Sequence, residues 1–385
     1  MAIVLFDSVN RNSLFPLTKT RSVAYLRTGI YTMAERWQHL TGMTVYIHTA
    51  AYLQDLYGCP DTVEHIWIDA AVLPTPDLMD KMQGLSNGSC WADEKGLIIG
   101  KHHFPFAAFE ALQSLQHFTH IHDHPLAERF EYPWQLVQWN DRMLRLDFET
   151  VIKGRKSATI SSTNKLIGTD QIFVEEGARI EHCILNASTG PIYIGKQAEV
   201  MEGTAIRGPF AMGANSVIKM NSRIYGATSL GPNCMAGGEI KNSIMIGYSN
   251  KAHDGYMGDS VIGEWCNWGA GTSNSNLKNT AGMIKVWNEA ANNYLEAGYK
   301  CGVMMGDYSR TAINSSINTG TVIGISSNVF GEGLLPNIIP DFSWGCKGVK
   351  YKMDKALNDI DNWKKLKNAA LTDTEKIFLH HLNEK

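Results

Sequence analysis

Residues 194–236 read IGKQAEVMEGTAIRGPFAMGANSVIKMNSRIYGATSLGPNCMA, and this stretch decides the fold. Every sixth residue is apolar, and seven of the eight are large and aliphatic: Ile194, Val200, Ile206, Met212, Ile218, Ile224, Leu230 and Ala236. A period of six fits neither the 3.6-residue turn of a helix nor the alternation of a strand. It is typical of a β-solenoid of triangular section, whose apolar residues point inward. The alternative is a β-sandwich in accidental register, but sandwich strands are spaced irregularly.

Glycine often follows the inward residue, as at Gly195, Gly213 and Gly231, and we expect these glycines to form corners with φ above zero. The repeat continues past this stretch in three successive phases: Ile240, Ile246 and Ala252; then Tyr256, Ile262 and Trp268; then Met305, Thr311, Ile317, Ile323 and Val329. The period disappears over 277–302. That segment is therefore predicted to be a loop or hairpin that leaves the coil, and solenoid insertions often carry the site.

Length and composition exclude several classes of protein. A chain of 385 residues favours two domains. The net charge of −3 and the absence of a dense Lys/Arg run argue against a nucleic-acid partner. No stretch approaches the ~20 apolar residues of a membrane span, and the apolar start of the chain is too short for a signal peptide. Seven scattered cysteines without a CxxC pair fit free thiols, so we expect a cytoplasmic protein.

The chain divides into three predicted regions. Residues 1–152 alternate strand and helix patterns, which predicts a Rossmann-like α/β domain with ligands at the carboxyl ends of its strands. Residues 153–345 form the solenoid. Residues 346–385 form a helical tail that covers the end of the coil, and Thr372 opens its last helix with a capping box.

The loop after the first predicted strand carries cations at the expected ligand edge. Residues 7–21 read DSVNRNSLFPLTKTR and resemble the opening signature of sugar-phosphate nucleotidyltransferases. The Arg and Pro-x-Thr parts are present at Arg11 and Pro16, but the glycines that let backbone N–H groups approach phosphates are missing. The resemblance implies that Arg11, Lys19 and Arg21 bind the sugar phosphate or nucleotide. The alternative is a polar loop with solvated arginines.

The same resemblance implies a Mg²⁺ site. Asp69 ends a predicted strand shortly before a proline, and Asn140 opens an Asn-Asp-Arg turn like that of the family. The family's metal ligands occupy such positions, and oxygen ligands suit Mg²⁺ during phosphoryl chemistry. The alternative for Asp69 is an ordinary helix-cap or turn residue.

The most specific motif lies in the solenoid. Residues 251–259 read KAHDGYMGD, residues 262–263 read IG, and residues 267–276 read NWGAGTSNSN. This run resembles the acetyltransferase domain of GlmU-type bifunctional enzymes, which have Lys-Ala-x-His-x-x-Tyr-x-Gly-Asp, then Ile-Gly, then Asn-x-Gly-Ala-Gly-Thr; this chain has one residue fewer before the His. The resemblance implies a left-handed parallel β-helix (hexapeptide repeats) that uses acetyl-CoA.

Position by position, the resemblance implies these roles: His253 as general base, Glu239 as its orienting or polarising partner, Arg223 and Lys241 as phosphate ligands, Tyr256 and Asn267 as partners of the sugar, a backbone N–H near Ala270 as oxyanion donor, and Asn276 as a contact of the acetyl group. A neutral imidazole suits proton removal from an amine. A lone surface His or Lys is usually only solvated, but the joint match favours a site. Where the family has an aromatic after the last Asn, this chain has Leu277 and a longer loop.

Three hypotheses follow. The first is a bifunctional enzyme that acetylates an amino-sugar 1-phosphate and couples a sugar 1-phosphate to a nucleoside triphosphate, giving UDP-N-acetylglucosamine or a related nucleotide sugar. The second is an acyltransferase whose N-terminal domain only binds sugar or nucleotide. The third is a non-enzymatic scaffold. The family's acetyl sites lie between subunits, so a homotrimer is expected, with the 277–302 excursion and its Trp287 and Tyr294 reaching a neighbour.

Overall fold

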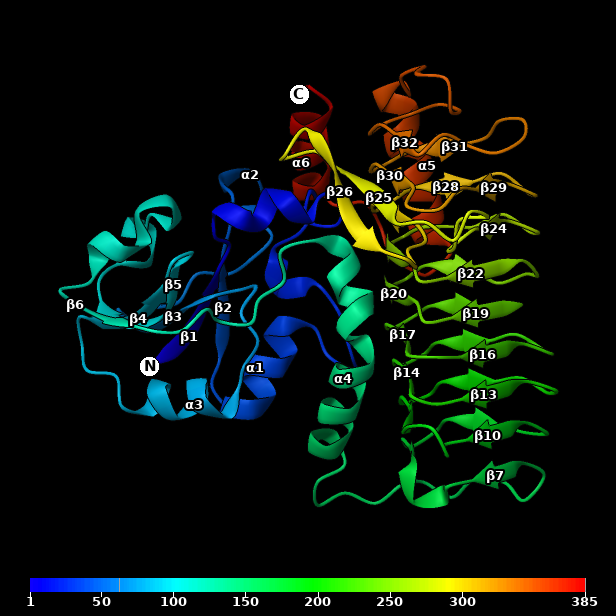
Figure 1. The fold of residues 1–385 in the computed structure, drawn as a ribbon, viewed down its shortest axis with the longest axis horizontal. Coiled ribbons are helices and arrows are strands. Elements are labelled where there is room, and N and C mark those ends of the chain that lie inside the picture. The colour runs from blue at the N-terminus through cyan, green and yellow to red at the C-terminus, as the bar shows by residue number, and fades with distance from the viewer. Residues whose placement is uncertain (62, 385) are drawn as a thin grey trace.

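The computed structural model describes residues 1–61 and 63–384. Figure 1 shows an α/β domain beside a tall coil of short strands, with two helices at the end of the chain. This arrangement confirms the predicted Rossmann-like domain, the β-solenoid and the helical tail. Within the described ranges, no helix combines the length and the apolar character that crossing a membrane requires.

A six-stranded sheet forms the centre of the N-terminal domain, in the order β2-β1-β3-β5-β4-β6. Its strands are β1 (Ala2–Phe6), β2 (Val45–His48), β3 (Glu64–Asp69), β4 (Ser89–Asp93), β5 (Gly96–His103) and β6 (His120–Asp123). The strands β1, β2 and β3 are parallel, as the alternating pattern predicts, whereas β5 runs antiparallel to both of its neighbours. The helices between them are α1 (Met33–Thr41), α2 (Ala51–Gln54) and α3 (Pro76–Gln83).

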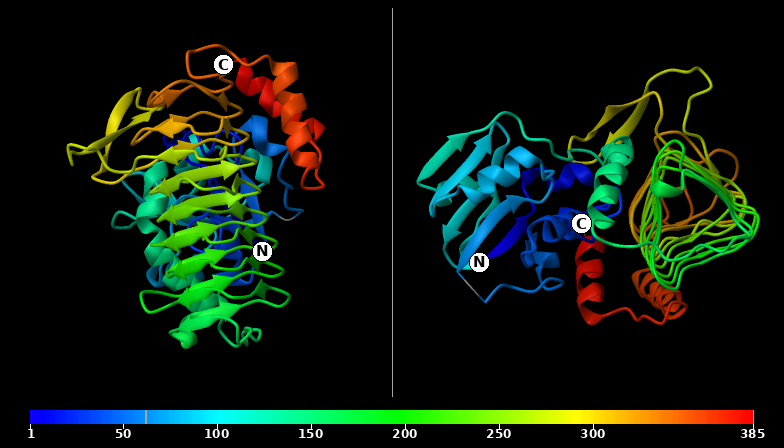
Figure 2. Two further views of the ribbon diagram at one scale, coloured as in Figure 1. Left: turned by 90° about the vertical axis from the view of Figure 1, so that its right-hand side faces the viewer. Right: turned by 90° about the horizontal axis from the view of Figure 1, so that it is seen from below.

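The solenoid stacks parallel strands in three columns. The open sheet, which has no other segment in front of it in Figure 2, contains β7 (Lys165–Ile167), β10 (Ile184–Asn186), β13 (Ala205–Arg207), β16 (Arg223–Tyr225), β19 (Glu239–Lys241) and β22 (Tyr256–Gly258). The docked sheet, which faces the N-terminal domain, contains β8 (Ile172–Val174), β11 (Ile192–Ile194), β14 (Phe210–Met212), β17 (Thr228–Leu230), β20 (Ile244–Gly247), β23 (Val261–Glu264), β27 (Met304–Met305), β30 (Val322–Ile323) and β32 (Ile338–Ile339).

The third sheet completes the coil. It contains β9 (Arg179–Ile180), β12 (Glu199–Val200), β15 (Val217–Ile218), β18 (Met235–Ala236) and β21 (Asn250–Lys251), and β28 (Arg310–Thr311) with β31 (Asn328–Val329) continue it. A further pair, β24 (Ser273–Asn274) and β29 (Ser316–Ile317), lies beyond β22. The predicted inward residues of 194–236 are all buried inside this coil.

The glycines after the inward residues have a role other than the predicted one. Positive φ occurs instead two positions later, at Gln197 (57°) and Asn215 (57°). A Cβ on Gly195 would lie 2.7 Å from the backbone of the next turn at Gly213. These glycines therefore permit the close stacking of successive turns, and the expectation that they form the corners is wrong.

The repeat also slips by one residue after Ile240. Met245, five positions later, pairs with Leu230 and lies inside the coil, while Ile246 packs outward against the N-terminal domain. Lys251 then takes the inward position where Ala252 was expected, and Met257 takes it in place of Tyr256. Five residues in place of six separate these two inward positions. Such a one-residue shift moves each following side chain to the opposite face of its strand.

Helix α4 (Pro133–Val151) connects the two halves (Figure 1). Its residues Leu136 and Met143 belong to the same apolar core as Ile246, Val261 and Met304 of the docked sheet. This core also includes the inner residues of β1 and β3. One continuous core therefore joins the α/β domain to the solenoid, and this core opposes independent motion of the two domains.

The predicted excursion is a hairpin of β25 (Ile284–Asn288) and β26 (Asn293–Gly298). It packs on its own N-terminal domain: Asn288 Nδ2 donates to Ser13 O at 2.8 Å, and Gln138 Nε2 of α4 donates to Ala297 O at 2.9 Å. The hairpin is thus held by its own chain, and its expected contact with a neighbouring subunit stays a prediction. The tail forms α5 (Met353–Lys365) and α6 (Asp373–Asn383), and the Thr372 capping box is confirmed.

Candidate active site

Two rows of side chains cross the open sheet. In the first row Arg223, Glu239 and Tyr256 occupy one register position on successive turns. In the second row Tyr225, Lys241 and Gly258 do the same. Since Ile224, Ile240 and Met257 between them are buried in the coil, strand alternation directs both rows outward. Residues predicted from separate parts of the motif thus meet on one surface.

The first row is linked by charge and hydrogen bonding. Tyr225 Oη donates to Glu239 Oε1 at 2.6 Å, and Arg223 Nε lies 3.9 Å from Glu239 Oε2. The hydrogen bond to Glu239 and burial together raise the pKa of Tyr225. Lys241 Nζ lies 5.9 Å from the centre of the Tyr225 ring, and within the described ranges it forms no ion pair. The surface therefore holds a cation that is free to meet an anion.

The second row ends at a cluster of amides around Asp259. Asn242 Nδ2 donates to Asp259 Oδ1 at 2.6 Å, and Asn276 Nδ2 donates to Asp259 Oδ2. A Cβ at Gly258 would collide with the Tyr256 hydroxyl, so the missing side chain lets the Tyr256 ring lie across the strand toward Asn276. Burial, followed by the Asp259 carboxylate, raises the pKa of Tyr256, which remains a hydroxyl donor at neutral pH.

His253 lies at the corner between the third sheet and the open sheet. Its side chain is exposed, and the turn through Gly255, with φ 118°, leads directly into β22. The next turn stacks on this corner, because Gly271 N–H donates to Asp254 O at 3.0 Å. Ala270 precedes Gly271, and no acceptor among the described residues takes the Ala270 N–H. An imidazole and a free backbone donor therefore lie on adjacent corners.

Two predicted roles are not supported by contacts in the single chain. Glu239 interacts with Tyr225 and Arg223, and in the described part of the chain it forms no hydrogen bond or ion pair with His253. Asn267 lies on the third sheet, paired with Asn250 and Arg310, and not on the open sheet with Lys241. The roles of Glu239 and Asn267 stay predictions.

A cavity of 690 Å³ lies next to Asn276. Leu277, Lys278 and Lys285 line it together with Tyr294 of the hairpin and amides from later turns, and no carboxylate lines it. Lys278 Nζ donates to Met283 O at 2.7 Å. Leu277 and the loop after it thus border a cavity that is basic and partly apolar.

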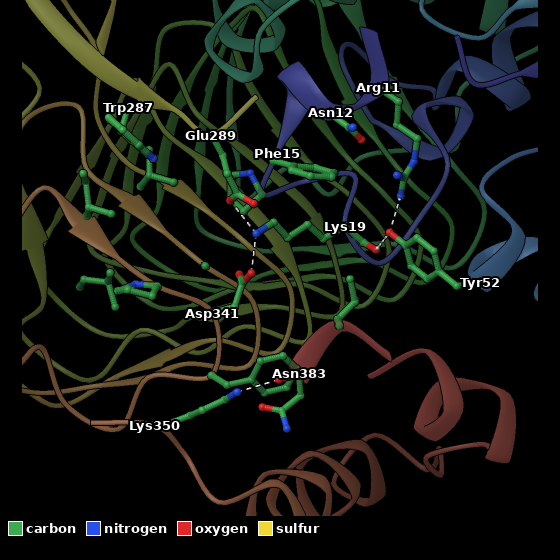
Figure 3. Close-up of a pocket in the computed structure, with 18 residues that line it drawn as sticks. Arg11, Asn12, Phe15, Lys19, Tyr52, Trp287, Glu289, Asp341, Lys350 and Asn383 are labelled. Carbon is green, nitrogen blue, oxygen red and sulfur yellow. Dashed lines mark hydrogen bonds and ion pairs between the residues drawn. The ribbon is translucent and has the colours of Figure 1, made fainter. Parts of the chain in front are cut away.

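The residues of the N-terminal loop that were predicted to bind phosphate contact other groups of the protein. Lys19 Nζ contacts Glu289 Oε2 at 2.7 Å and also pairs with Asp341 (Figure 3). Arg11 donates to Tyr52 Oη at 2.8 Å and pairs with Asp7. These side chains line a cavity of 540 Å³ between the loop, the hairpin and the tail. The predicted phosphate ligands Arg11 and Lys19 are thus partnered by groups of the chain itself.

Arg21 is also paired with carboxylates of the chain itself. Arg21 Nη2 pairs with Asp307 of the solenoid, and Arg21 Nη1 lies 3.3 Å from Glu264 Oε1. Burial disfavours the charged guanidinium, but the Asp307 and Glu264 carboxylates overcome this and raise the pKa of Arg21. Thr20 Oγ1 donates to the same Asp307 at 2.6 Å. The loop is therefore clamped onto the solenoid, in contrast to the open phosphate loop that the resemblance implied.

The Mg²⁺ prediction from Asp69 and Asn140 is wrong. Asn140 is fully buried between α4 and the docked sheet, where Oδ1 accepts from Gly29 N–H at 2.7 Å and Nδ2 donates to Ala227 O at 2.8 Å. Asp69 is buried and paired with Arg129 at 3.1 Å. Burial raises the pKa of Asp69 to about 6. Both side chains are saturated by protein partners, so they do not fit a metal.

Sequence reasoning missed two residues of this surface and one buried residue behind it. Tyr225 was not predicted to hold Glu239, Asp259 was not assigned to Asn276, and Lys251 was not placed inside the coil. The motif run contains Asp259 and Lys251, but only the register of the strands shows what each contacts.

Comparison with known proteins finds similarity to sugar nucleotidyl transferases and to bifunctional enzymes. Residues 3–156 match the family described as "Sugar nucleotidyl transferase". The chain is 35% identical over 147 residues to the bifunctional sugar-1-phosphate nucleotidylyltransferase/acetyltransferase of Sulfurisphaera tokodaii, covering 37% of this chain and 35% of the relative. Over part of its length, this chain is therefore similar to sugar nucleotidyl transferases and to proteins named GlmU.

Two further relatives carry the name bifunctional protein GlmU. That of Methanocaldococcus jannaschii is 37% identical over 86 residues, which are 22% of this chain and 21% of the relative. That of Synechococcus elongatus is 25% identical over 193 residues, which are 48% of this chain and 38% of the relative. The matched part of the chain thus spans well under half of each of these relatives.

Proposed function

We propose that the solenoid transfers an acetyl group from acetyl-CoA to the nitrogen of an amino-sugar 1-phosphate. The observation that carries this proposal is the open-sheet surface, where Arg223, Lys241 and Tyr256 lie on successive strands and the exposed His253 lies at the corner before the last of them. A phosphate dianion needs cations, and the unpaired Lys241 is the first candidate for it. The strand rows are about 7 Å apart along the chain, a distance that suits a bound monosaccharide.

The chemistry requires a base and an oxyanion donor. His253 accepts a proton from the sugar amine as the nitrogen attacks the thioester carbonyl, forming the C–N bond. The carbonyl oxygen becomes an oxyanion, which the Ala270 N–H stabilises. The C–S bond then breaks, and the coenzyme A thiolate leaves with the proton that His253 carried. Tyr256 holds the sugar through its hydroxyl.

The acyl donor is proposed to occupy the 690 Å³ cavity beside Asn276. Its Lys278 and Lys285 suit the phosphates of coenzyme A, and Leu277 with Tyr294 suits its apolar arm. Asn276 lies between this cavity and Tyr256, as a contact of the acetyl group should.

A homotrimer is part of the proposal. The open sheet is uncovered in the single chain (Figure 2), and Asn267 lies on another sheet of the coil. A second copy placed against the open sheet would bring its own third-sheet residues to the site. This arrangement accounts for an Asn that the motif includes but that one chain keeps apart from Lys241.

For the N-terminal domain two readings remain. Its similarity to sugar nucleotidyl transferases supports coupling of a sugar 1-phosphate to a nucleoside triphosphate, giving UDP-N-acetylglucosamine or a related product. The clamped loop favours the second reading, in which this domain binds sugar or nucleotide without catalysis. Pyrophosphate release from purified protein with sugar 1-phosphates, nucleoside triphosphates and Mg²⁺ decides between them.

The test of the acetyl-transfer site is His253→Ala. We expect acetyl transfer to fall by about two to four orders of magnitude, with little change in the KM for the sugar phosphate. Lys241→Ala should raise that KM. Matched controls are His182→Ala, another exposed solenoid histidine, and Arg207→Ala, which stands in the Lys241 row two turns earlier. Near-normal transfer by the His253 variant, or equal losses in the controls, would remove the proposed site.

A further inference from the structure

A lysine stands inside the apolar coil. In the third sheet, Lys251 pairs in register with Ala236, which pairs with Ile218 on the turn before. The next turn pairs Asn267 with Asn250, so Trp268 continues the same inward column. Lys251 is only 2% exposed. An aliphatic residue would fill this position without the cost of burying an amine. The presence of a lysine here therefore indicates that its amine has a role.

The amine is used at two corners. Lys251 Nζ donates to Gly237 O at 2.8 Å and to His253 O at 2.6 Å. These carbonyls belong to successive corners of the coil, directly before β19 and β22. The small side chain of Ala236 on the preceding turn leaves room for the amine to turn back toward them. Lys251 therefore ties the turn that carries His253 to the turn that carries Glu239.

The Lys251 amine can fill this role in either protonation state. Burial lowers the pKa of Lys251 to about 8; nearby Asp254 and Glu239 act against burial, and Arg223 acts with it. No carboxylate forms an ion pair with Lys251 in the described part of the chain. A neutral amine has two N–H donors, and two carbonyls accept them. The contact is thus satisfied whether or not the amine carries a charge.

We propose that Lys251 is a positioning residue of the acetyl-transfer site, whose buried amine fixes the His253–Gly255 turn and thereby the direction of the His253 imidazole. This inference rests on the proposed function. Without the amine, the carbonyls of Gly237 and His253 lose their donor inside the coil and the corner loosens. A base displaced by about 1 Å costs on the order of 100-fold in rate.

The experiment compares Lys251→Met with wild type and with Lys196→Met, an exposed solenoid lysine without a side-chain partner in the described structure. Methionine keeps the length and apolar body of the side chain and removes the donors. We expect the kcat for acetyl transfer to fall about 100-fold, the KM for the sugar phosphate to stay within about threefold, and amides of residues 252–258 to exchange faster with deuterium. Tyr256 and Gly258 N–H report this directly, because they bond to Ser273 and Asn274.

The amide exchange separates this inference from the proposed function. If wild-type protein transfers no acetyl group, the proposed function fails, and faster exchange in 252–258 still supports the tie made by Lys251. Exchange and kcat equal to wild type would overturn the inference, as would a low kcat with unchanged exchange. If Lys251→Met does not fold, Lys251→Leu, which is also apolar and has no donor, takes its place with the same expected readouts.

Discussion

Asp307→Asn tests the clamp between the N-terminal loop and the solenoid. Asp307 is 3% exposed, its Oδ2 accepts from Thr20 Oγ1 at 2.6 Å and pairs with Arg21, and its Oδ1 accepts from Glu264 N–H at 2.8 Å. The variant leaves the buried guanidinium of Arg21 with Glu264 alone and turns an NH₂ donor toward it. Breaking one partner of a buried pair costs about 3–5 kcal/mol. Since Glu264 remains at 3.3 Å, we expect about 3 kcal/mol.

The assay is urea unfolding followed by tryptophan fluorescence, with the free energy of unfolding extrapolated to water. Asp141→Asn is the matched control, because it breaks an ion pair with Arg145 in which both side chains are about half exposed. That pair should contribute less than about 1 kcal/mol. A loss below about 1 kcal/mol for Asp307→Asn, or an equal loss for the control, would refute the reasoning that burial makes the clamp strong.

Three further predictions concern stability and assembly. Since the pKa of Lys251 is about 8 in the folded chain against 10.5 for an ordinary lysine, the unfolded chain binds more protons between these pH values, and stability should rise by about 3 kcal/mol from pH 8 to 10.5. Denaturation of wild type and Lys251→Met across this range checks it, because the variant should lack the rise. Asn140→Ala leaves Gly29 N–H and Ala227 O unpaired under α4 and should cost about 2–4 kcal/mol in the same urea assay. Light scattering at micromolar concentration should give the mass of three chains; the mass of one chain would contradict the proposed trimer.

The solenoid was predictable because its rule is local. Each of the three sides of a turn must present one apolar residue inward, so a period of six appears in the sequence without knowledge of any distant contact. The phase after Ile240 was not predictable in the same way. Met245 follows Ile240 by five residues and still pairs with Leu230 in the inward column. This register is a property of paired strands, which the sequence of one strand does not reveal. That single slip explains why Lys251 was missed as an interior residue and why Ile246 proved to face the N-terminal domain.

The open-sheet part of the site was predictable from the motif spacing, and the N-terminal part was not. Arg223 and Lys241 are one turn apart, so the solenoid repeat alone places them on one face. The partners of Lys19 and Arg21 depend on how a separate domain docks. Asp307 and Asp341 lie roughly 300 residues later in the chain, and nothing within the loop sequence indicates them.

The ion pairs that hold the N-terminal loop on the solenoid affect where a phosphate ligand can bind. A phosphate that approached Lys19 would have to displace both Glu289 and Asp341, and one that approached Arg21 would have to displace Asp307. Displaced Asp341 would be left partly buried and displaced Asp307 fully buried without a cation, which opposes binding. On the open sheet, Lys241 meets no such competition. A ligand that carries phosphate therefore binds at the solenoid at lower cost, unless the loop first separates from the coil. Because one apolar core joins the two halves, such separation exposes buried apolar surface, and nucleotide binding at the loop would be coupled to the geometry of the solenoid.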